Sequence, residues 1–176
     1  MIYLLRHCKA SGQDDTAELT SEGLAAAKNI VPVLSELNIQ EIHCSTMTRA
    51  IETVRPFANE YNLSINVTEV LKERILSNNP LEDWKKVLEA SFLDFDYKLE
   101  NAESSNEALD RILNLVNNLD HDKQHLIVSH GNLLSLLINK FDKQFGFVKS
   151  LNMKNPDLYQ LDLINQSVKQ ITMQLT

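Results

Sequence analysis

Apolar and polar positions along the chain form blocks that predict strands and helices in turn. Two apolar runs, Ile2–Leu5 and Leu126–Val128, are not interrupted by polar residues, which is typical of strands buried on both faces of a parallel sheet. Apolar residues recur at helical spacing over 24–34 and 108–119, each time behind a Ser or Thr that can cap a helix. This order predicts a three-layer α/β/α fold with a mostly parallel sheet.

The other blocks extend the pattern. Segments 41–44 and 63–67 are predicted strands, the helix that starts at Thr20 or Ser21 is expected to end near residue 37, and further helices are expected to begin within 45–54 and at 131. Segments 158–163 and 168–175 are strand-like and are joined by a short polar stretch. They predict a hairpin that forms an antiparallel edge of the sheet.

Residues 75–101 fit neither pattern. Four of the eleven aromatic residues lie between Trp84 and Tyr97, among acidic side chains. Such a segment is either a lid over a site or a subdomain with a small core of its own. We therefore expect one domain over 1–176, with 75–101 as a lid or insertion. Trp84 with Lys85 and Lys86 could contact an anionic or aromatic substrate, but a solvated amphipathic turn is the preferred interpretation.

The amino-acid composition limits the kinds of molecule that the protein is expected to bind. The formal net charge of -7 argues against nucleic acid, which is bound by clustered Lys and Arg, but permits a small anionic substrate where positive charge is concentrated. No apolar run is long enough to span a bilayer, and the N-terminal one is too short for a signal peptide, so a cytoplasmic protein is expected. Cys8 and Cys44 are too few for a disulfide scaffold.

Basic side chains follow the ends of the predicted strands. Arg6 and His7 follow the first strand, His130 and Gly131 follow a later one, and Arg49 opens a helix. Because the carboxyl ends of parallel strands meet at one edge of a sheet, we expect these residues to form one phosphate site, with an imidazole as nucleophile and guanidiniums as oxygen ligands. Each of them alone is more commonly structural. The residues themselves leave the proton donor open among Glu52, Glu73, Asp83 and Glu103.

Six short pieces, in order along nearly the whole chain, resemble the histidine phosphatase superfamily, the phosphoglycerate-mutase-like family: Leu4-Leu5-Arg6-His7, Leu19-Thr20-Ser21-Glu22-Gly23, Cys44-Ser45-Thr46-Met47-Thr48-Arg49-Ala50-Ile51-Glu52-Thr53, Leu71-Lys72-Glu73-Arg74, Glu103-Ser104 and Val128-Ser129-His130-Gly131. The resemblance implies that His7 is the phosphorylated nucleophile, that Arg6, Arg49 and His130 bind the phosphate, and that Glu73 is the proton donor. Cys8 stands where the family has glycine, so its side chain must point into the core for activity to persist.

By this resemblance the protein is expected to hydrolyse a small phosphorylated metabolite, without a metal or cofactor. The short segment after Glu73 favours this phosphatase branch over the alternative, a phosphoglycerate mutase. A phosphoryl-ligand-binding or regulatory module without turnover is the alternative of another class. The oligomeric state stays open.

Two rival chemistries use other residues. His43, Cys44 and Arg49 are similar to the loop of cysteine phosphatases, but only four residues separate Cys44 from Arg49 and the loop's glycines are missing. A zinc site built from His7, Cys8, His43 and Cys44 is disfavoured because adjacent residues of a strand face opposite ways. The remaining histidines, His121 and His125, are expected to be solvated.

Overall fold

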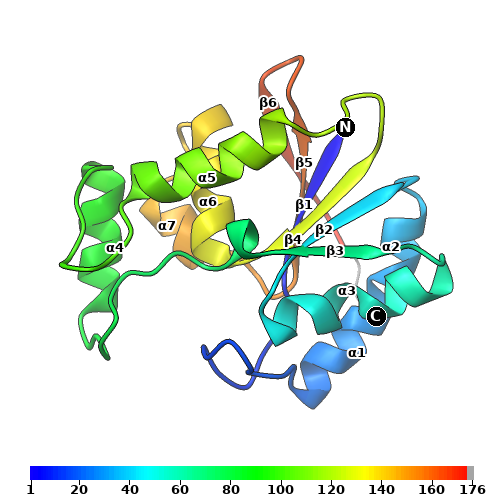
Figure 1. Cartoon of the computed structure of the whole chain (residues 1–176), viewed down its shortest axis with the longest axis horizontal. Coiled ribbons are helices and arrows are strands. Elements are labelled where there is room, and N and C mark those ends of the chain that lie inside the picture. The colour runs from blue at the N-terminus through cyan, green and yellow to red at the C-terminus, as the bar shows by residue number, and fades with distance from the viewer. Residues whose placement is uncertain (174–176) are drawn as a thin grey trace.

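The computed structural model describes residues 1–173, and within them six strands form one sheet in the order β3-β2-β4-β1-β5-β6. Strands β1 to β4 are parallel, β5 is antiparallel to β1, and β6 is antiparallel to β5. This arrangement confirms the predicted fold class, including the antiparallel edge (Figure 1). The strands are β1 (Ile2–Arg6), β2 (Glu41–Ser45), β3 (Ile65–Thr68), β4 (His125–Ser129), β5 (Asp157–Asp162) and β6 (Ser167–Ile171).

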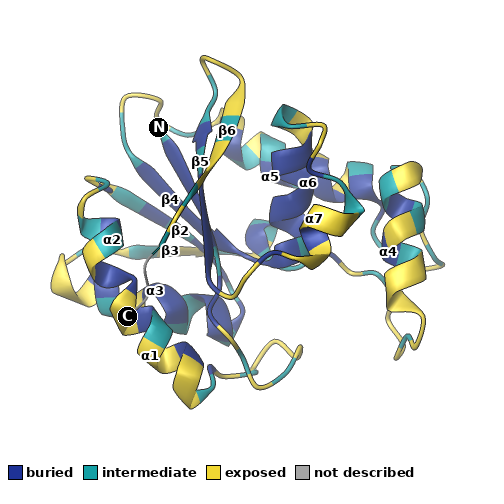
Figure 2. Ribbon diagram, turned by 180° about the vertical axis from the view of Figure 1, so that it is seen from behind, coloured by how far each residue is buried: buried dark blue, intermediate teal, exposed yellow. Residues whose placement is uncertain are grey.

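Helices cover both faces of the sheet, and a separate core fills each interface. Neighbouring residues of β1 alternate between the two: Leu5 packs in the core that includes Ile30 and Val54, and Leu4 packs in the core that includes Ile112 and Leu137. Figure 2 shows the buried strands lying between helices whose outer faces are exposed. The helices are α1 (Ser21–Asn29), α2 (Val31–Ser35), α3 (Thr48–Glu60), α4 (Trp84–Leu93), α5 (Ser105–Asn117), α6 (Gly131–Phe141) and α7 (Phe147–Leu151), with a short 3₁₀ helix, η1, at Glu69–Leu71.

The first predicted helix is in fact two helices. The break falls at Ile30, and Pro32 lies in the first turn of α2. Proline has no N–H to donate and its ring crowds the preceding turn, so a helix starts there more easily than it continues. Pro56, in contrast, is accommodated inside α3.

Helices α4 and α7 lie where no helix was predicted. Trp84, Lys85 and Lys86 are exposed as expected, but they form the first turn of α4 and not an isolated turn. Two aromatic side chains at the end of this segment, Phe92 and Phe95, pack against the core beneath α5 and α6, with an edge-to-face ring contact at 6.2 Å. Figure 1 shows α4 as the helix farthest from the sheet.

The C-terminal hairpin is confirmed by β5 and β6, although β6 ends at Ile171. The last two residues of the predicted strand 168–175 lie outside the described residues. Across residues 1–173, none of the helices has the length and apolar character needed to traverse a lipid bilayer.

Candidate active site

The carboxyl edge of the sheet brings the two strand-end histidines together. Arg6 and Ser129 are register partners at the ends of β1 and β4, and the His7 N–H donates to the Ser129 carbonyl at 3.0 Å. The next residue of each chain segment is a histidine, and the ring centroids of His7 and His130 are 5.1 Å apart. Both side chains are buried.

The His7 ring is oriented by one hydrogen bond. Its Nδ1 lies 2.6 Å from the carbonyl oxygen of Cys8, which can only accept, so Nδ1 carries the proton and Nε2 keeps its lone pair. Burial is the main cause that lowers the pKa of His7 to about 3; the hydrogen bond to the Cys8 carbonyl opposes this shift, and the charges of Arg49 and Arg6 add to it. His7 is therefore a neutral imidazole near pH 7, the form that can act as a nucleophile.

The His130 ring is held from the other side by Ser45. The Ser45 hydroxyl oxygen accepts the N–H of Met47 at 3.2 Å, and its own proton can be donated to His130 Nε2 at 2.8 Å. His130 Nδ1 then carries a proton, and it is buried without a partner in the described chain. Burial, followed by repulsion from a protonated His7 and by the charge of Arg49, holds the pKa of His130 well below its ordinary value. This imidazole is thus a neutral donor.

Two guanidiniums accompany the imidazoles. Arg49, in the first turn of α3, is 1% exposed, and its Nη1 donates to the carbonyls of Gln13 (3.1 Å) and Asp14 (2.8 Å). Arg6 donates from Nη1 to the Met153 carbonyl at 2.5 Å. The Nε atoms of both arginines are buried and lack a partner among residues 1–173. Buried cationic donors without acceptors favour an anion beside them.

Gly131 makes room for one of these guanidiniums. A Cβ at this position would lie 2.9 Å from Arg6 Cζ and 3.0 Å from its Nε. Those contacts are closer than side chains tolerate, so a larger residue at 131 would displace Arg6. Glycine is needed here to leave room for the arginine.

Glu73 faces the first turn of α6. Its carboxylate accepts backbone N–H groups from Asn132 (3.0 Å), Leu133 (2.9 Å) and Arg74 (2.9 Å). A carboxylate has about four acceptor positions, so one is left for a ligand or a water. The helix N-terminus holds the group in place.

The other three candidate acids have different surroundings. Glu52 accepts the Leu19 N–H at 2.8 Å, Glu103 pairs with Arg111 at 2.6 Å, and Asp83 precedes α4 on an exposed segment. None of the three belongs to the wall of the cavity described below, whereas Glu73 does.

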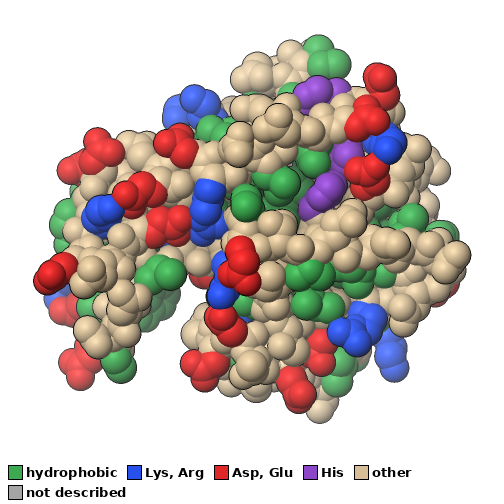
Figure 3. Space-filling model, viewed as in Figure 1, with side chains coloured by type: hydrophobic (Ala, Val, Ile, Leu, Met, Phe, Trp, Pro, Cys, Tyr) green, Lys and Arg blue, Asp and Glu red, His purple; other side chains and the backbone are tan. Residues whose placement is uncertain are grey.

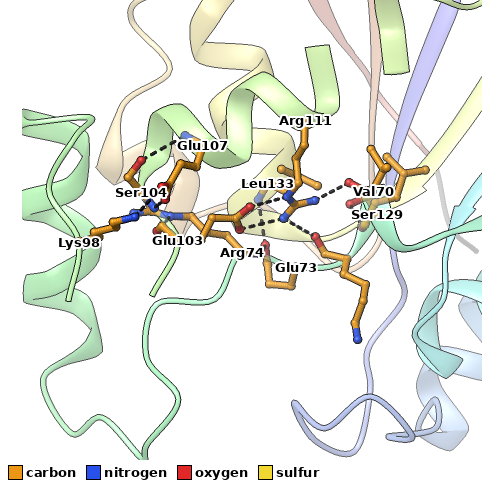
Figure 4. A network of polar contacts seen from close by, with 12 residues as sticks. Val70, Glu73, Arg74, Lys98, Glu103, Ser104, Glu107, Arg111, Ser129 and Leu133 are labelled. Atoms are coloured by element: carbon orange, nitrogen blue, oxygen red, sulfur yellow. Dashed lines mark hydrogen bonds and ion pairs between the residues drawn. The ribbon is translucent and has the colours of Figure 1, made fainter. Parts of the chain in front are cut away.

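A polar network fixes the segment that carries Glu73 (Figure 4). The Arg111 guanidinium donates to the carbonyls of Val70 and Lys72, the latter at 2.9 Å, and to both carboxylate oxygens of Glu103. Arg111 therefore clamps the chain just before Glu73 to α5. The sequence analysis missed this role, because a single arginine on a helix gives no local signal of it.

Arg74 performs a similar task on the other side. It is buried and donates to the hydroxyls of Ser91 in α4 (2.8 Å) and Ser105 in α5 (2.9 Å). Burial lowers its pKa to about 10, so it remains charged. It ties α4 to the helix layer and was also missed.

A cavity of about 680 Å³ opens at this edge, a volume suited to a metabolite. Figure 3 shows the molecule hollowed between the part that carries α4 and the part formed by α1 and α3. His7 and His130 are not part of the wall, and His7 is 8% exposed. The wall includes Arg6, Gln13, Met47, Arg49, Glu73, Gly131 and Asn132 from the body, and Ile75, Leu76, Ser77, Asn79, Pro80, Leu81, Trp84 and Leu88 from segment 75–101.

Both cysteines point away from this chemistry. Cys8 and Cys44 are fully buried in the apolar core beneath α1 and α3. Burial raises the pKa of Cys8 to about 11 and raises that of Cys44 as well, so neither is a thiolate near pH 7. Cys8 replaces the family glycine without entering the cavity, and Cys44 lacks the environment of a nucleophile.

The rival zinc site does not form either, because both of its cysteines lie in the core while the ring of His43 lies against His125 instead. The expectation that His125 is solvated is wrong, since it is 1% exposed. Its neighbour in sequence, His121, is exposed as expected.

Comparison with solved structures finds proteins of the same fold. A mycobacterial glucosyl-3-phosphoglycerate phosphatase, solved with VO3, superposes with a TM-score of 0.75 at 20% identity and covers 99% of this chain and 98% of its own. YhfR of Bacillus stearothermophilus gives 0.73 at 21% identity, covering 97% and 95%. A phosphoserine phosphatase mutant of Entamoeba histolytica with phosphoserine gives 0.70 at 17%, covering 97% and 94%.

These identities are low enough that the likeness establishes a shared fold. The family itself follows from a separate match: the model of the histidine phosphatase superfamily, branch 1, covers residues 2–175. The resemblance drawn from the six short pieces is thereby confirmed, and the chain belongs to the histidine phosphatase superfamily.

Proposed function

We propose that this protein hydrolyses phosphomonoesters of small metabolites through a phosphohistidine formed at His7. The observation that carries the proposal is the state of the His7 ring, which is neutral, oriented through Nδ1 by the Cys8 carbonyl, and left with a free lone pair on Nε2. Fold relatives solved with VO3 and with phosphoserine support a phosphoryl substrate.

The reaction has two balanced steps. His7 Nε2 forms a bond to phosphorus while the bond from phosphorus to the ester oxygen breaks, and the departing oxygen takes a proton. Water then attacks phosphorus, loses a proton, and releases inorganic phosphate with the His7 lone pair restored. Arg6, Arg49 and the Nδ1–H of His130 would bind the phosphoryl oxygens, as their unpartnered buried donors favour. Gly131 would preserve the position of Arg6.

Glu73 is the residue we assign to proton transfer. It is the one of the four candidate carboxylates in the cavity wall, and the first turn of α6 fixes its position. It would protonate the leaving oxygen in the first step and take a proton from water in the second. No metal or cofactor has a part in this scheme.

Segment 75–101 would act as the lid that selects the substrate. It gives the cavity wall five apolar residues, Ile75, Leu76, Leu81, Trp84 and Leu88, while the body contributes Arg6 and Arg49. A substrate that joins a phosphate to an apolar or ring-containing alcohol would fit both sides. We place the enzyme in the cytoplasm, where its two free, buried cysteines would remain reduced.

Trapping of the covalent intermediate tests the proposal. After mixing with an aryl phosphate and quenching in alkali, the intact mass of the protein should show one added phosphoryl group, located at His7. The variant His7→Gln should show none, whereas Cys8→Ala should behave as the wild type. Hydrolysis without an adduct at His7 would refute the assignment, and phosphate binding without turnover would indicate a regulatory module. Formation of 2-phosphoglycerate from 3-phosphoglycerate and its bisphosphate primer would indicate a mutase.

A further inference from the structure

The opposite edge of the sheet carries a second histidine pair. Glu41 and His125 are register partners at the first residues of β2 and β4, and His43 lies two residues along β2 on the same face. Figure 3 shows histidine side chains beside acidic and basic ones at the upper right, far from the hollow. Since the catalytic residues follow the last residues of these strands, about 15 Å of strand separates the two edges.

Three potential ligand atoms converge at this edge. His43 Nε2 lies 3.2 Å from His125 Nδ1, His125 Nδ1 lies 3.5 Å from Glu41 Oε2, and His43 Nε2 lies 3.7 Å from the same oxygen. The ligand atoms around a tetrahedral zinc ion, at about 2.0–2.1 Å from the metal, are separated from one another by about 3.3 Å. The observed spacings match the three edges of such a ligand set.

These three atoms carry too few hydrogen atoms for each of their three contacts to be a hydrogen bond. His125 Nε2 lies 2.7 Å from the carbonyl of Asp120, so it donates there, and Nδ1 of the neutral ring keeps its lone pair. One proton, on His43 Nε2, can bridge the two rings. Glu41 Oε2 then faces a lone pair and lies too far from His43 for a good hydrogen bond. Electron pairs that lie this close together repel one another, and a cation between them would remove this repulsion.

The side chains around the cluster do not supply this positive charge themselves, which favours a bound metal ion. Lys123 lies 2.5 Å from Glu41 Oε1, the other carboxylate oxygen, and so orients Oε2 toward the rings without reaching them. Asp120 lies 3.7 Å from the same ammonium and balances its charge. The bond from His125 Nε2–H to a backbone carbonyl is the usual outer contact of a metal-bound histidine.

We propose that Glu41, His43 and His125 form a site for a divalent transition metal, zinc being the ion that best fits two imidazoles and one carboxylate. The fourth position would hold water. His43 and Glu41 are partly exposed, at 14% and 30% of their side chains, so the ion can enter from solvent. The metal would link β2 to β4 at the edge away from the cavity and would stabilise the fold without taking part in catalysis.

Titration of the untagged, metal-free protein with Co²⁺ tests the site. The wild type should develop the visible absorption of four-coordinate cobalt at one equivalent, zinc should displace it, and zinc should raise the melting temperature. His43→Gln and Glu41→Gln should weaken binding by at least about 100-fold. Both residues are partly exposed, so these variants should fold, as circular dichroism can verify.

Two control variants separate this site from others. His121→Gln removes an exposed histidine close in sequence to the cluster and should bind cobalt as the wild type does. His7→Gln removes the histidine that could hold a metal at the catalytic edge and should also leave binding unchanged. Absence of the cobalt band, equal affinity in His43→Gln, or loss of binding in His7→Gln would overturn the proposal. Proton uptake by the rings without cobalt binding would identify the missing cation as a proton and would also overturn it.

Discussion

The two ends of the sheet carry the same pair of side chains in opposite electrostatic settings. At the carboxyl edge the rings of His7 and His130 have centroids 5.1 Å apart, and at the amino edge those of His43 and His125 are 5.4 Å apart. The first pair lies beside two arginines whose Nε atoms are buried, and the second lies beside a carboxylate. A histidine pair by itself therefore specifies no chemistry, and the charges around it set which kind of ion it suits.

The hydrogen bonds of the rings reinforce this difference. At the carboxyl edge one ring presents a lone pair and the other an N–H, which suits attack on phosphorus and binding of its oxygens. At the amino edge the ring nitrogens face each other and Glu41, which suits a shared cation. Both arrangements depend on backbone carbonyls, of Cys8 in one case and Asp120 in the other.

The largest contrast is expected from removing one histidine of each pair. His7→Gln should lower kcat for an aryl phosphate by at least about 10⁴-fold, because the nucleophile is lost. His43→Gln should leave kcat/KM within about twofold of the wild type, because the amino edge does not contact the substrate. Steady-state kinetics measure both, and equal losses in the two variants would abolish the distinction between the edges.

A smaller contrast is expected from the flanking cations. Arg49→Gln should lower kcat by about 10²–10³-fold, the usual effect of removing a donor to developing charge. Because Arg49 also holds Gln13 and Asp14, Arg49→Lys is the matched variant that keeps the charge. It should recover part of kcat. Lys123→Gln at the other edge should change neither kcat nor KM.

The free energy of unfolding at acidic pH should also test whether His7 is buried in its neutral form. The pKa of His7 is lowered to about 3, whereas an unfolded histidine titrates near 6.5, so the unfolded chain binds more protons between these values and stability falls as the pH falls. One such group contributes a loss of roughly 2–3 kcal/mol between pH 6.5 and 4.5. Urea unfolding at several pH values should show a flatter profile for His7→Gln. Parallel profiles would mean that the ring is not buried in neutral form.

The smallest effect concerns Cys8, which lies next to the proposed nucleophile but outside the cavity. Cys8→Gly restores the glycine of the family and empties a core position, which should cost about 1–2 kcal/mol of stability. Since the Cys8 carbonyl and not its side chain contacts His7, kcat should stay within a few-fold of the wild type. Thermal unfolding and kinetics on one preparation separate the two effects. A large gain in kcat would mean that the thiol obstructs the pocket.

Much of the fold follows from the local pattern of the sequence. The uninterrupted apolar runs of β1 and β4 and the capped helix after Ser104 are visible in the chain and recur in the structure. Helix α4 was missed although six of its ten residues are apolar, because the segment around it is irregular and the core that its Phe92 contacts is formed by distant parts of the chain. The break at Ile30 depended on one proline whose effect differs from that of Pro56.

The strand-end rule, together with the motif resemblance, predicted which residues gather at the carboxyl edge. Arg6, His7, Arg49 and His130 do lie together, and their catalytic roles stay predictions. Apart from the resemblance, nothing in the sequence favoured Glu73 over the other three acids. The structure favours it because Glu73 belongs to the cavity wall. The burial of His125 contradicted the expectation from its polar neighbours, because the strand and not the adjacent loop sets its surroundings.

The sequence by itself determined the alternation of strands and helices and the edge at which the basic residues meet, because both depend on short-range periodicity and on the direction of parallel strands. The tertiary structure alone decided the direction of each ring nitrogen, the position of the Cys8 thiol in the core, and the meeting of Glu41 with His43 and His125. These features arise where strands far apart in sequence become neighbours, and hydrogen bonds and burial there are set by partners that no local pattern encodes.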